Sequence, residues 1–355
     1  LAAVEIGRRF PLRRSVTIGL SLGAGFIVLV ASILSIHDVP GWVKWNFEGY
    51  EGKADYAEYR TLMETVDTLP PGRIMWEANS EMNKYGTPMA LMLFPYWSEG
   101  HPSMEGLFFE SSLTTPFHFL NASEVSERPS NPVRGLDYRG FNMERGIAHL
   151  AVYNVAYYVS FTDAGADAAR VAGLVEVGTA PPWHIFAMPP SDLVDIATIE
   201  PAVWAGGGDF LDPALEWYDD VENLDHWLVE DGPQEWERVE TVEERLLSVD
   251  AYDGSGVVSD VVTEDHRISF TTTAVGVPHL VKVSYFPNWT AEGADGPYRA
   301  APSLMVVVPT SEDVVLEFKN TNAENTGMAL TLTAAVGLGV YAYQRRKHRV
   351  ALDDA

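Results

Sequence analysis

Two glutamates lie close together in an apolar stretch of the sequence. Glu105 and Glu110 flank residues 106–109, which are a glycine, a leucine and two phenylalanines. A carboxyl group in apolar surroundings has a raised pKa and can act as a general acid or base. Paired carboxylates also suit the hydrolysis of glycosidic bonds. The alternative, which we favour, is that both glutamates form ion pairs with arginines such as Arg73 or Arg134.

Aromatic side chains are the second group with a chemical use. The chain has 10 tryptophans, and several of them, such as Trp97, Trp183 and Trp289, lie near proline or glycine. An exposed aromatic ring can stack on the C–H face of a sugar. Most tryptophans in a domain of this size are nevertheless expected in the core. The aromatic content is therefore compatible with glycan binding without requiring it.

Several other chemistries are excluded or disfavoured. The absence of cysteine rules out disulfides, thiolate nucleophiles and cysteine–metal sites. The nine histidines are far apart and form no H-E-x-x-H motif, so we expect no metal site and no cofactor. An acidic stretch over residues 219–225 has carboxylates that suit Ca²⁺, but their spacing does not match an EF-hand loop. A formal net charge of −26 argues against nucleic acid as a partner.

Two uncharged apolar runs predict how the chain is arranged relative to a membrane. Residues 15–36 and 326–343 contain no charged side chain or histidine. As helices, the two runs would be about 33 Å and about 27 Å long, against about 30 Å for a hydrocarbon core. Arginines precede the first run, and arginines and a lysine follow the second. Because basic flanks stay cytoplasmic, we expect two membrane spans, both termini inside, and an acidic domain outside.

The resulting domain organisation has six parts. The chain begins with Leu1, and the basic segment before the first run is typical of a loop that leaves an earlier helix. We therefore expect the C-terminal part of a longer, multi-pass plasma-membrane protein. The predicted parts are a cytoplasmic loop (1–14), a transmembrane helix (15–37), an extracytoplasmic α/β domain (38–235), a β-sandwich (236–325), a second transmembrane helix (326–344) and a cytoplasmic tail (345–355).

Hydrophobic periodicity gives the elements of the outer part. Apolar residues at helical spacing predict helices over 55–69 and 143–155. Strands are predicted at 73–77, 156–161, 174–177 and 184–187, so strand and helix alternate as in an α/β layer. The later part of the chain has short β-type runs separated by glycine, proline, asparagine and aspartate, and several of these runs alternate apolar and polar residues. This pattern predicts an antiparallel sandwich. These runs are 257–262, 267–273, 279–286, 304–308 and 314–318. The predicted fold class is α+β and membrane-anchored.

Several segments carry a family resemblance. The stretches GRIMWE, NKYGTPMALMLFPYW, SMEGLFFESS and NPVRGL, which lie within residues 72–136, resemble prokaryotic membrane proteins labelled 6-pyruvoyl-tetrahydropterin synthase-related. The segment VKVSYFPNWT, which begins at Val281, is similar to the closing β-domain of a broader group. That group is similar to membrane glycosyltransferases of the GT-C type, which take sugars from polyprenyl-phosphate carriers. The three-histidine zinc site that a pterin synthase needs is not apparent in this sequence.

The resemblance implies a role in cell-envelope polysaccharide assembly. The catalytic acidic residue of GT-C enzymes usually lies in an early outer loop, among the first membrane helices, so we assign no catalytic residue in this chain. The residues implied to bind glycan are Arg73, Trp76, Glu77, Lys84, Tyr85, Glu105, Glu110, Arg134, Trp289 and Arg299.

The expected partners are a lipid-linked sugar or envelope glycan, membrane lipid, and other membrane helices of the longer protein. Two alternatives stay open. One is a non-enzymatic glycan-binding or scaffold module, and the other is an independent hydrolase that uses Glu105 and Glu110.

Overall fold

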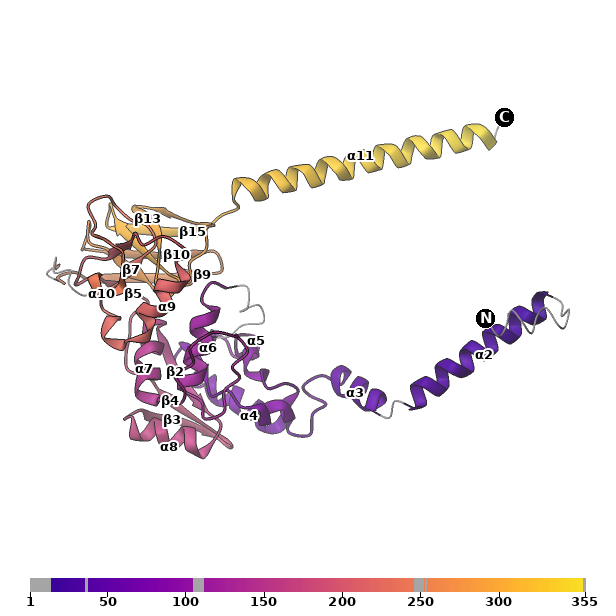
Figure 1. The fold of residues 1–355 in the computed structure, drawn as a ribbon, viewed down its shortest axis with the longest axis horizontal. Coiled ribbons are helices and arrows are strands. Elements are labelled where there is room, and N and C mark those ends of the chain that lie inside the picture. The colour runs from indigo at the N-terminus through magenta and orange to yellow at the C-terminus, as the bar shows by residue number, and fades with distance from the viewer. Residues whose placement is uncertain (1–13, 36–37, 105–111, 246–251, 253, 354–355) are drawn as a thin grey trace.

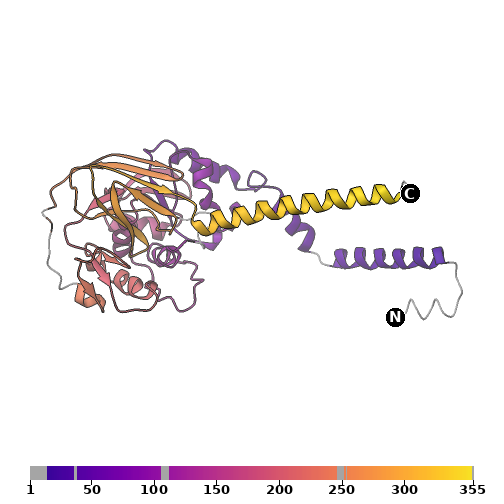
Figure 2. The same ribbon diagram turned by 90° about the horizontal axis from the view of Figure 1, so that it is seen from above.

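A folded body and two projecting terminal helices make up the chain (Figure 1). The computed structural model describes residues 14–35, 38–104, 112–245, 252 and 254–353. Both views show the two terminal helices leaving the body on the same side (Figures 1 and 2). The body contains helices, a mixed four-stranded sheet, a seven-stranded sheet and an antiparallel four-stranded sheet. The predicted α+β class is therefore confirmed.

The mixed four-stranded sheet forms the first part of the body. Its strand order is β1 (Arg73–Trp76), β2 (Val155–Ser160), β4 (Trp183–Ala187) and β3 (Val175–Ala180). β1 and β2 are parallel, whereas the β2–β4 and β3–β4 pairs are antiparallel. A parallel pair needs a long connection. This connection holds short helices: η1 (Ser80–Tyr85), η2 (Ala90–Leu93), α5 (Phe94–Trp97), α6 (Thr115–Glu124) and α7 (Met143–Val152).

Helices pack against this sheet, and the sequence predicts the apolar face of the first of them. α4 (Tyr56–Val66) buries Tyr59, Leu62, Met63 and Val66, which recur at helical spacing. The Tyr59 hydroxyl donates a hydrogen bond of 2.9 Å to the Ala90 carbonyl. α8 (Asp163–Val171) follows β2 and begins after Thr162, whose side chain accepts from the Gly165 amide. The predicted helices at 55–69 and 143–155 therefore correspond to α4 and α7, each somewhat shorter than expected.

The seven-stranded sheet lies at the centre of the body. Its order is β5 (Val194–Ile196), β11 (His279–Val281), β14 (Leu304–Pro309), β13 (Ala294–Ala300), β7 (Leu228–Val229), β6 (Ala202–Trp204) and β8 (Arg238–Val239). Segments from both predicted outer domains contribute strands to it. The predicted boundary at 235/236 falls between β7 and β8 of this sheet.

The antiparallel sheet packs on one face of the seven-stranded sheet. It is ordered β12 (Trp289–Glu292), β15 (Asp313–Phe318), β10 (Arg267–Thr272) and β9 (Val258–Glu264). Side chains of β14 alternate between two cores, as the two-residue period of a strand requires. Met305 and Val307 join the core shared with the antiparallel sheet. Leu304 and Val306 join the core that includes the mixed sheet, α7, α8 and α9 (Leu211–Asp219).

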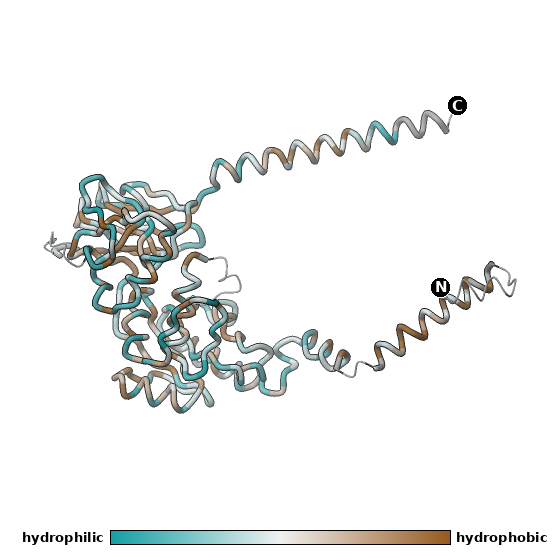
Figure 3. The backbone as a smooth tube through the Cα atoms, in the orientation of Figure 1, coloured by the Kyte–Doolittle hydropathy of each residue, from teal (hydrophilic) through white to brown (hydrophobic). Residues whose placement is uncertain are grey.

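The terminal helices are bare of protein contacts along much of their length. α2 (Arg14–Ser35) and α11 (Asn322–Asp353) occupy the regions of the two predicted spans. Among the described residues, Asn322–Arg346 is long and apolar enough to cross a membrane, and none of its most apolar window is buried. The apolar part of α2, Ile18–Ile33, is shorter. Figure 3 shows the hydrophobic residues along α2 and the middle of α11.

Candidate functional site

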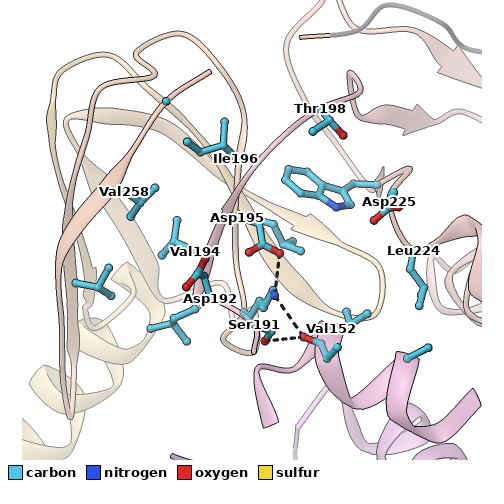
Figure 4. Close-up of a pocket in the computed structure, with 18 of the residues that line it drawn as sticks. Val152, Ser191, Asp192, Val194, Asp195, Ile196, Thr198, Leu224, Asp225 and Val258 are labelled. Carbon is cyan, nitrogen blue, oxygen red and sulfur yellow. Dashed lines mark hydrogen bonds and ion pairs between the residues drawn. The ribbon is translucent and has the colours of Figure 1, made fainter. Parts of the chain in front are cut away.

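A cavity of about 750 Å³ opens between the edge of the seven-stranded sheet and α7. β5, β9, the C-terminal end of α7 and the short helix η4 (Val221–Asn223) surround it. Its polar lining includes Ser191, Asp192, Asp195, Thr198, Asp225 and Lys282, and its apolar lining includes Val152, Val194, Leu224, Trp227 and Val258 (Figure 4). Cavities of this size with a few convergent polar groups are typical of ligand sites.

An ion pair lies inside this cavity. The Lys282 ammonium is 2.8 Å from the Asp195 carboxylate, and the two side chains are 5% and 38% exposed. Strand register explains the contact. Asp195 pairs with Leu280 in the antiparallel β5–β11 ladder. Lys282 lies two residues beyond Leu280 and therefore points to the same face, diagonally across from Asp195.

The same lysine connects the sheet to the end of α7. Lys282 Nζ donates to the Ala151 carbonyl at 3.3 Å, and the Ser191 hydroxyl donates to that carbonyl at 3.2 Å (Figure 4). The Ser191 hydroxyl also lies 3.2 Å from Asn154 Oδ1. Carbonyls in the last turn of a helix lack intrahelical partners and carry partial negative charge, so a cation is favourable there. Contacts with β5 and with the end of α7 therefore fix the position of Lys282 at the polar end of the cavity.

Negative charge dominates the cavity. Its lining residues include three aspartates and one lysine. Burial raises the pKa of the Asp195 carboxyl, Lys282 lowers it, and Asp192 and Asp225 raise it further, so that the pKa lies above its ordinary value. The cavity therefore favours neutral or cationic ligands over anions.

The shifted pKa of Asp195 predicts a pH effect on stability. Between the ordinary value of 3.8 and the raised pKa, the folded chain binds more protons than the unfolded chain. The free energy of unfolding therefore falls as pH rises through this window. We expect Asp195→Asn, which stays neutral, to lack this component. Thermal unfolding in detergent as a function of pH measures it, and parallel profiles for the two proteins would contradict the expectation.

Arg73, a predicted ligand residue, instead connects the mixed sheet to Lys282, the residue that directly follows β11. Its guanidinium donates to the Tyr153 carbonyl and, at 3.2 Å, to the Lys282 carbonyl. Burial lowers the pKa of Arg73 to about 10, so the side chain stays charged at neutral pH. Arg73 thus supports the backbone next to the cavity without lining it.

Trp76 and Glu77 are buried in the body. Trp76 is 1% exposed, and its ring centroid lies 6.0 Å from that of Phe94. The Glu77 carboxylate accepts hydrogen bonds from the Phe161 amide at 2.8 Å, the Thr162 amide at 2.9 Å and the Thr162 hydroxyl at 2.7 Å. These donors bring the turn between β2 and α8 onto the end of β1. Glu77 has its hydrogen bonds within the fold, as a buried carboxylate requires.

Lys84 and Tyr85 lie together, as their sequence positions imply. Both donate to Glu58 Oε2 at 2.7 Å, and these two hydrogen bonds lower the pKa of Glu58. The Tyr85 ring lies against Trp183, with centroids 4.7 Å apart. Tyr85 is 1% exposed. This pair of predicted site residues therefore holds η1 against α4 and the mixed sheet.

The remaining predicted residues are dispersed. Trp289 is partly buried on the edge strand β12 and packs edge-on against Phe318, with centroids 5.4 Å apart. Arg299 donates to the Ser303 hydroxyl at 3.1 Å and lies over Phe210 at 5.2 Å. Arg134 is exposed between α6 and α7. Glu105 and Glu110 lie outside the described residues. No single site among the described residues unites the predicted set.

A second cavity, of about 730 Å³, includes one predicted residue, Trp76. Its other lining is mostly apolar, with Met89, Phe119 and Pro132 as examples and Arg128 as the charged member. Its lining has one charged side chain, whereas the cavity of about 750 Å³ around Lys282 (the Lys282 cavity) has four, including an ion pair, and we therefore take the Lys282 cavity as the candidate site.

Sequence reasoning missed the Lys282 cavity. Asp225 stood out only as part of an acidic stretch, and Asp192, Asp195 and Lys282 did not stand out. One signal was present: Lys282 is a charged residue inside the apolar run 279–286 that was predicted as a strand. A charged residue in such a run either faces solvent or has a partner, and the structure provides a partner on β5.

Comparison with protein-family models, with curated proteins and with solved structures found no match for this chain. Within the described residues, no group of three or more histidine, aspartate or glutamate side chains is arranged to hold a metal ion. The site must therefore be interpreted from its own geometry and charge.

Proposed function

We propose that this chain is the glycan-binding part of a membrane protein similar to GT-C glycosyltransferases, and that the Lys282 cavity holds the glycan. The observation that carries the proposal is the lining of the cavity. Carboxylates of Asp192, Asp195 and Asp225 can accept hydrogen bonds from sugar hydroxyl groups. The apolar side chains beside them can cover the C–H faces of a sugar ring.

The charge of the cavity narrows the ligand class. With three aspartates against one lysine, uronic acids and sugar phosphates would be repelled. A neutral hexose or an amino sugar within an envelope glycan fits better. Lys282 and Ser191 already have partners within the fold, so they hold the cavity in shape, whereas the exposed Asp192 and Asp225 contact the glycan.

Membrane anchoring through two spans is part of the proposal. α11 meets the length and hydropathy of a spanning helix over Asn322–Arg346. α2 has 22 residues, or about 33 Å at the rise of an α-helix, and Ile18–Ile33 forms its apolar part. Basic residues beyond both apolar runs favour cytoplasmic termini and an extracytoplasmic body. We infer that catalysis, where it occurs, depends on membrane helices other than these two.

Titration calorimetry of the full chain in nanodiscs, with neutral, amino-bearing and acidic oligosaccharides, tests this function. We expect binding of a neutral or amino-bearing glycan and none of an acidic one. Asp192→Asn and Asp225→Asn should each weaken binding by about 1.5–3 kcal/mol, which is the contribution of a hydrogen bond to a charged group.

Asp163→Asn is the matched control, since Asp163 is exposed on α8 and absent from the cavity lining. It should leave the affinity unchanged. Equal affinities for all four proteins would contradict the assignment of the cavity. Binding of no glycan by any of them would contradict the glycan-binding function itself.

A further inference from the structure

The short helix α3 (Asp38–Phe47) presents a bare apolar stripe. Val39, Val43 and Phe47 follow each other at intervals of four residues and so lie on one side of the helix. Their exposed fractions are 37%, 41% and 83%, and Trp42 next to them is 63% exposed. Large apolar side chains gathered and exposed in this way mark an interaction surface.

The opposite side of α3 is fixed to the body. Lys53 Nζ lies 3.8 Å from the centre of the Trp45 ring and donates to the Trp45 carbonyl. The same ammonium pairs with Glu48 Oε1 at 3.1 Å. Lys53 itself is 7% exposed. These contacts tie the Trp45 side of α3 to the buried Lys53 in the turn that follows the helix, and the stripe lies on the other side.

The position of the stripe indicates what covers it. α3 begins three residues after α2 ends, and in Figure 1 it lies between α2 and the body. On the proposed topology, residues next to the outer end of a span meet the layer of lipid headgroups. Tryptophan and phenylalanine are favoured there, because part of each ring can enter the acyl region. Lys44, exposed and off the stripe, can extend to water or phosphate.

A similar arrangement occurs where α11 leaves the body. Phe286 is 41% exposed and lies 5.9 Å, centre to centre, from the ring of Phe318. Lys319 follows at once and is 58% exposed at its side chain. Asn288 Nδ2 donates to the Lys319 carbonyl at 2.9 Å and to Glu324 Oε2 at 2.8 Å, which joins the sandwich to the start of α11. Aromatic and lysine side chains thus occur together at both attachment points.

From these observations we propose that α3 is an interfacial helix whose Val39–Val43–Phe47 stripe is immersed at the headgroup–acyl boundary of the bilayer. The partner is a zwitterionic lipid surface, because an acidic body would be repelled by anionic lipid. This inference rests on the proposed membrane anchoring. Its consequence is that α3 is held at two sides, by lipid and by Lys53, and so fixes the height and tilt of the body above the membrane.

Because the chain lacks cysteine, single-cysteine variants can be spin-labelled at one chosen position. We would reconstitute the full chain in phosphatidylcholine nanodiscs and measure collisions of the label with oxygen, which concentrates in lipid, and with a water-soluble nickel chelate. Val43→Cys reports on the stripe. Val171→Cys, on α8, is the matched control, since Val171 is 86% exposed in the folded body. Leu332→Cys reports on the middle of α11 and hence on anchoring.

We expect the label at position 43 to collide preferentially with oxygen at a shallow depth, the label at position 332 to read deeper, and the label at position 171 to read as aqueous. A deep reading at 332 with an aqueous reading at 43 would overturn the interfacial helix and leave anchoring intact. Aqueous readings at both 43 and 332 would overturn anchoring together with the inference.

Discussion

Replacing Glu124 by glutamine should lower the free energy of unfolding by about 3–5 kcal/mol, because it removes one charge from a buried ionic network. Glu124 is 1% exposed. Its two carboxylate oxygens lie 2.9 Å from Arg145 Nε and 2.7 Å from His149 Nδ1. These contacts join α6 to α7, and His149 in turn stacks on Tyr218 with ring centres 3.9 Å apart.

Thermal unfolding in detergent measures the loss. Glu144→Gln is the matched control, since Glu144 is an exposed glutamate on the same helix as His149. Its effect should stay within about 0.5 kcal/mol. Because Glu124 and His149 act as a unit, the double variant with His149→Gln should lose less than the sum of the two single losses. A Glu124→Gln protein as stable as the control would show that the network adds nothing to stability.

Replacing Trp76 by alanine should cost about 3–5 kcal/mol, which is the usual range when a buried tryptophan leaves a cavity. Trp76 belongs to a core that includes Phe94, Met82, Val159 and Ile185. The family resemblance implied a role for Trp76 in glycan binding. Its burial makes it a packing residue, and we therefore expect a loss of stability without loss of affinity in any protein that stays folded.

Tyr96→Ala is the control for this substitution. Tyr96 is 75% exposed on α5, so its removal should change stability by about 0.5 kcal/mol at most. Unfolding experiments in detergent compare the two variants, and calorimetry with the glycan compares their affinities. A stable Trp76→Ala protein that has lost glycan binding would show that Trp76 contributes to glycan binding.

Local sequence patterns predicted many of the elements. The spacing of Tyr59, Leu62, Met63 and Val66 gives α4 a single apolar face, and that face is buried. The apolar run at 304–308 corresponds to β14, a central strand with both faces covered. Such patterns succeed because a helix or a strand must bury one side whatever its partner is.

Local sequence patterns did not predict several other elements. β5 to β8 have two or three residues each, and they become strands only because distant segments of the chain lie beside them, as β11 lies beside β5 and β13 beside β7. β13 contains Gly296, with φ +101°, and Pro297, which are signals that normally end a strand. The ladder accommodates them through a register shift between Asp295 and Tyr298. β11 ends at Val281, earlier than the predicted strand over 279–286.

The sequence by itself determined the composition-level properties of this protein: two long apolar runs, an acidic middle and an α+β set of elements. Only the tertiary structure decided which polar side chains meet. The pairing of β5 with β11 brings Asp195 to Lys282, and the packing of α6 on α7 brings Glu124 to His149. The reason is physical: periodicity fixes which face of an element is apolar, whereas contacts between distant residues depend on which elements lie side by side.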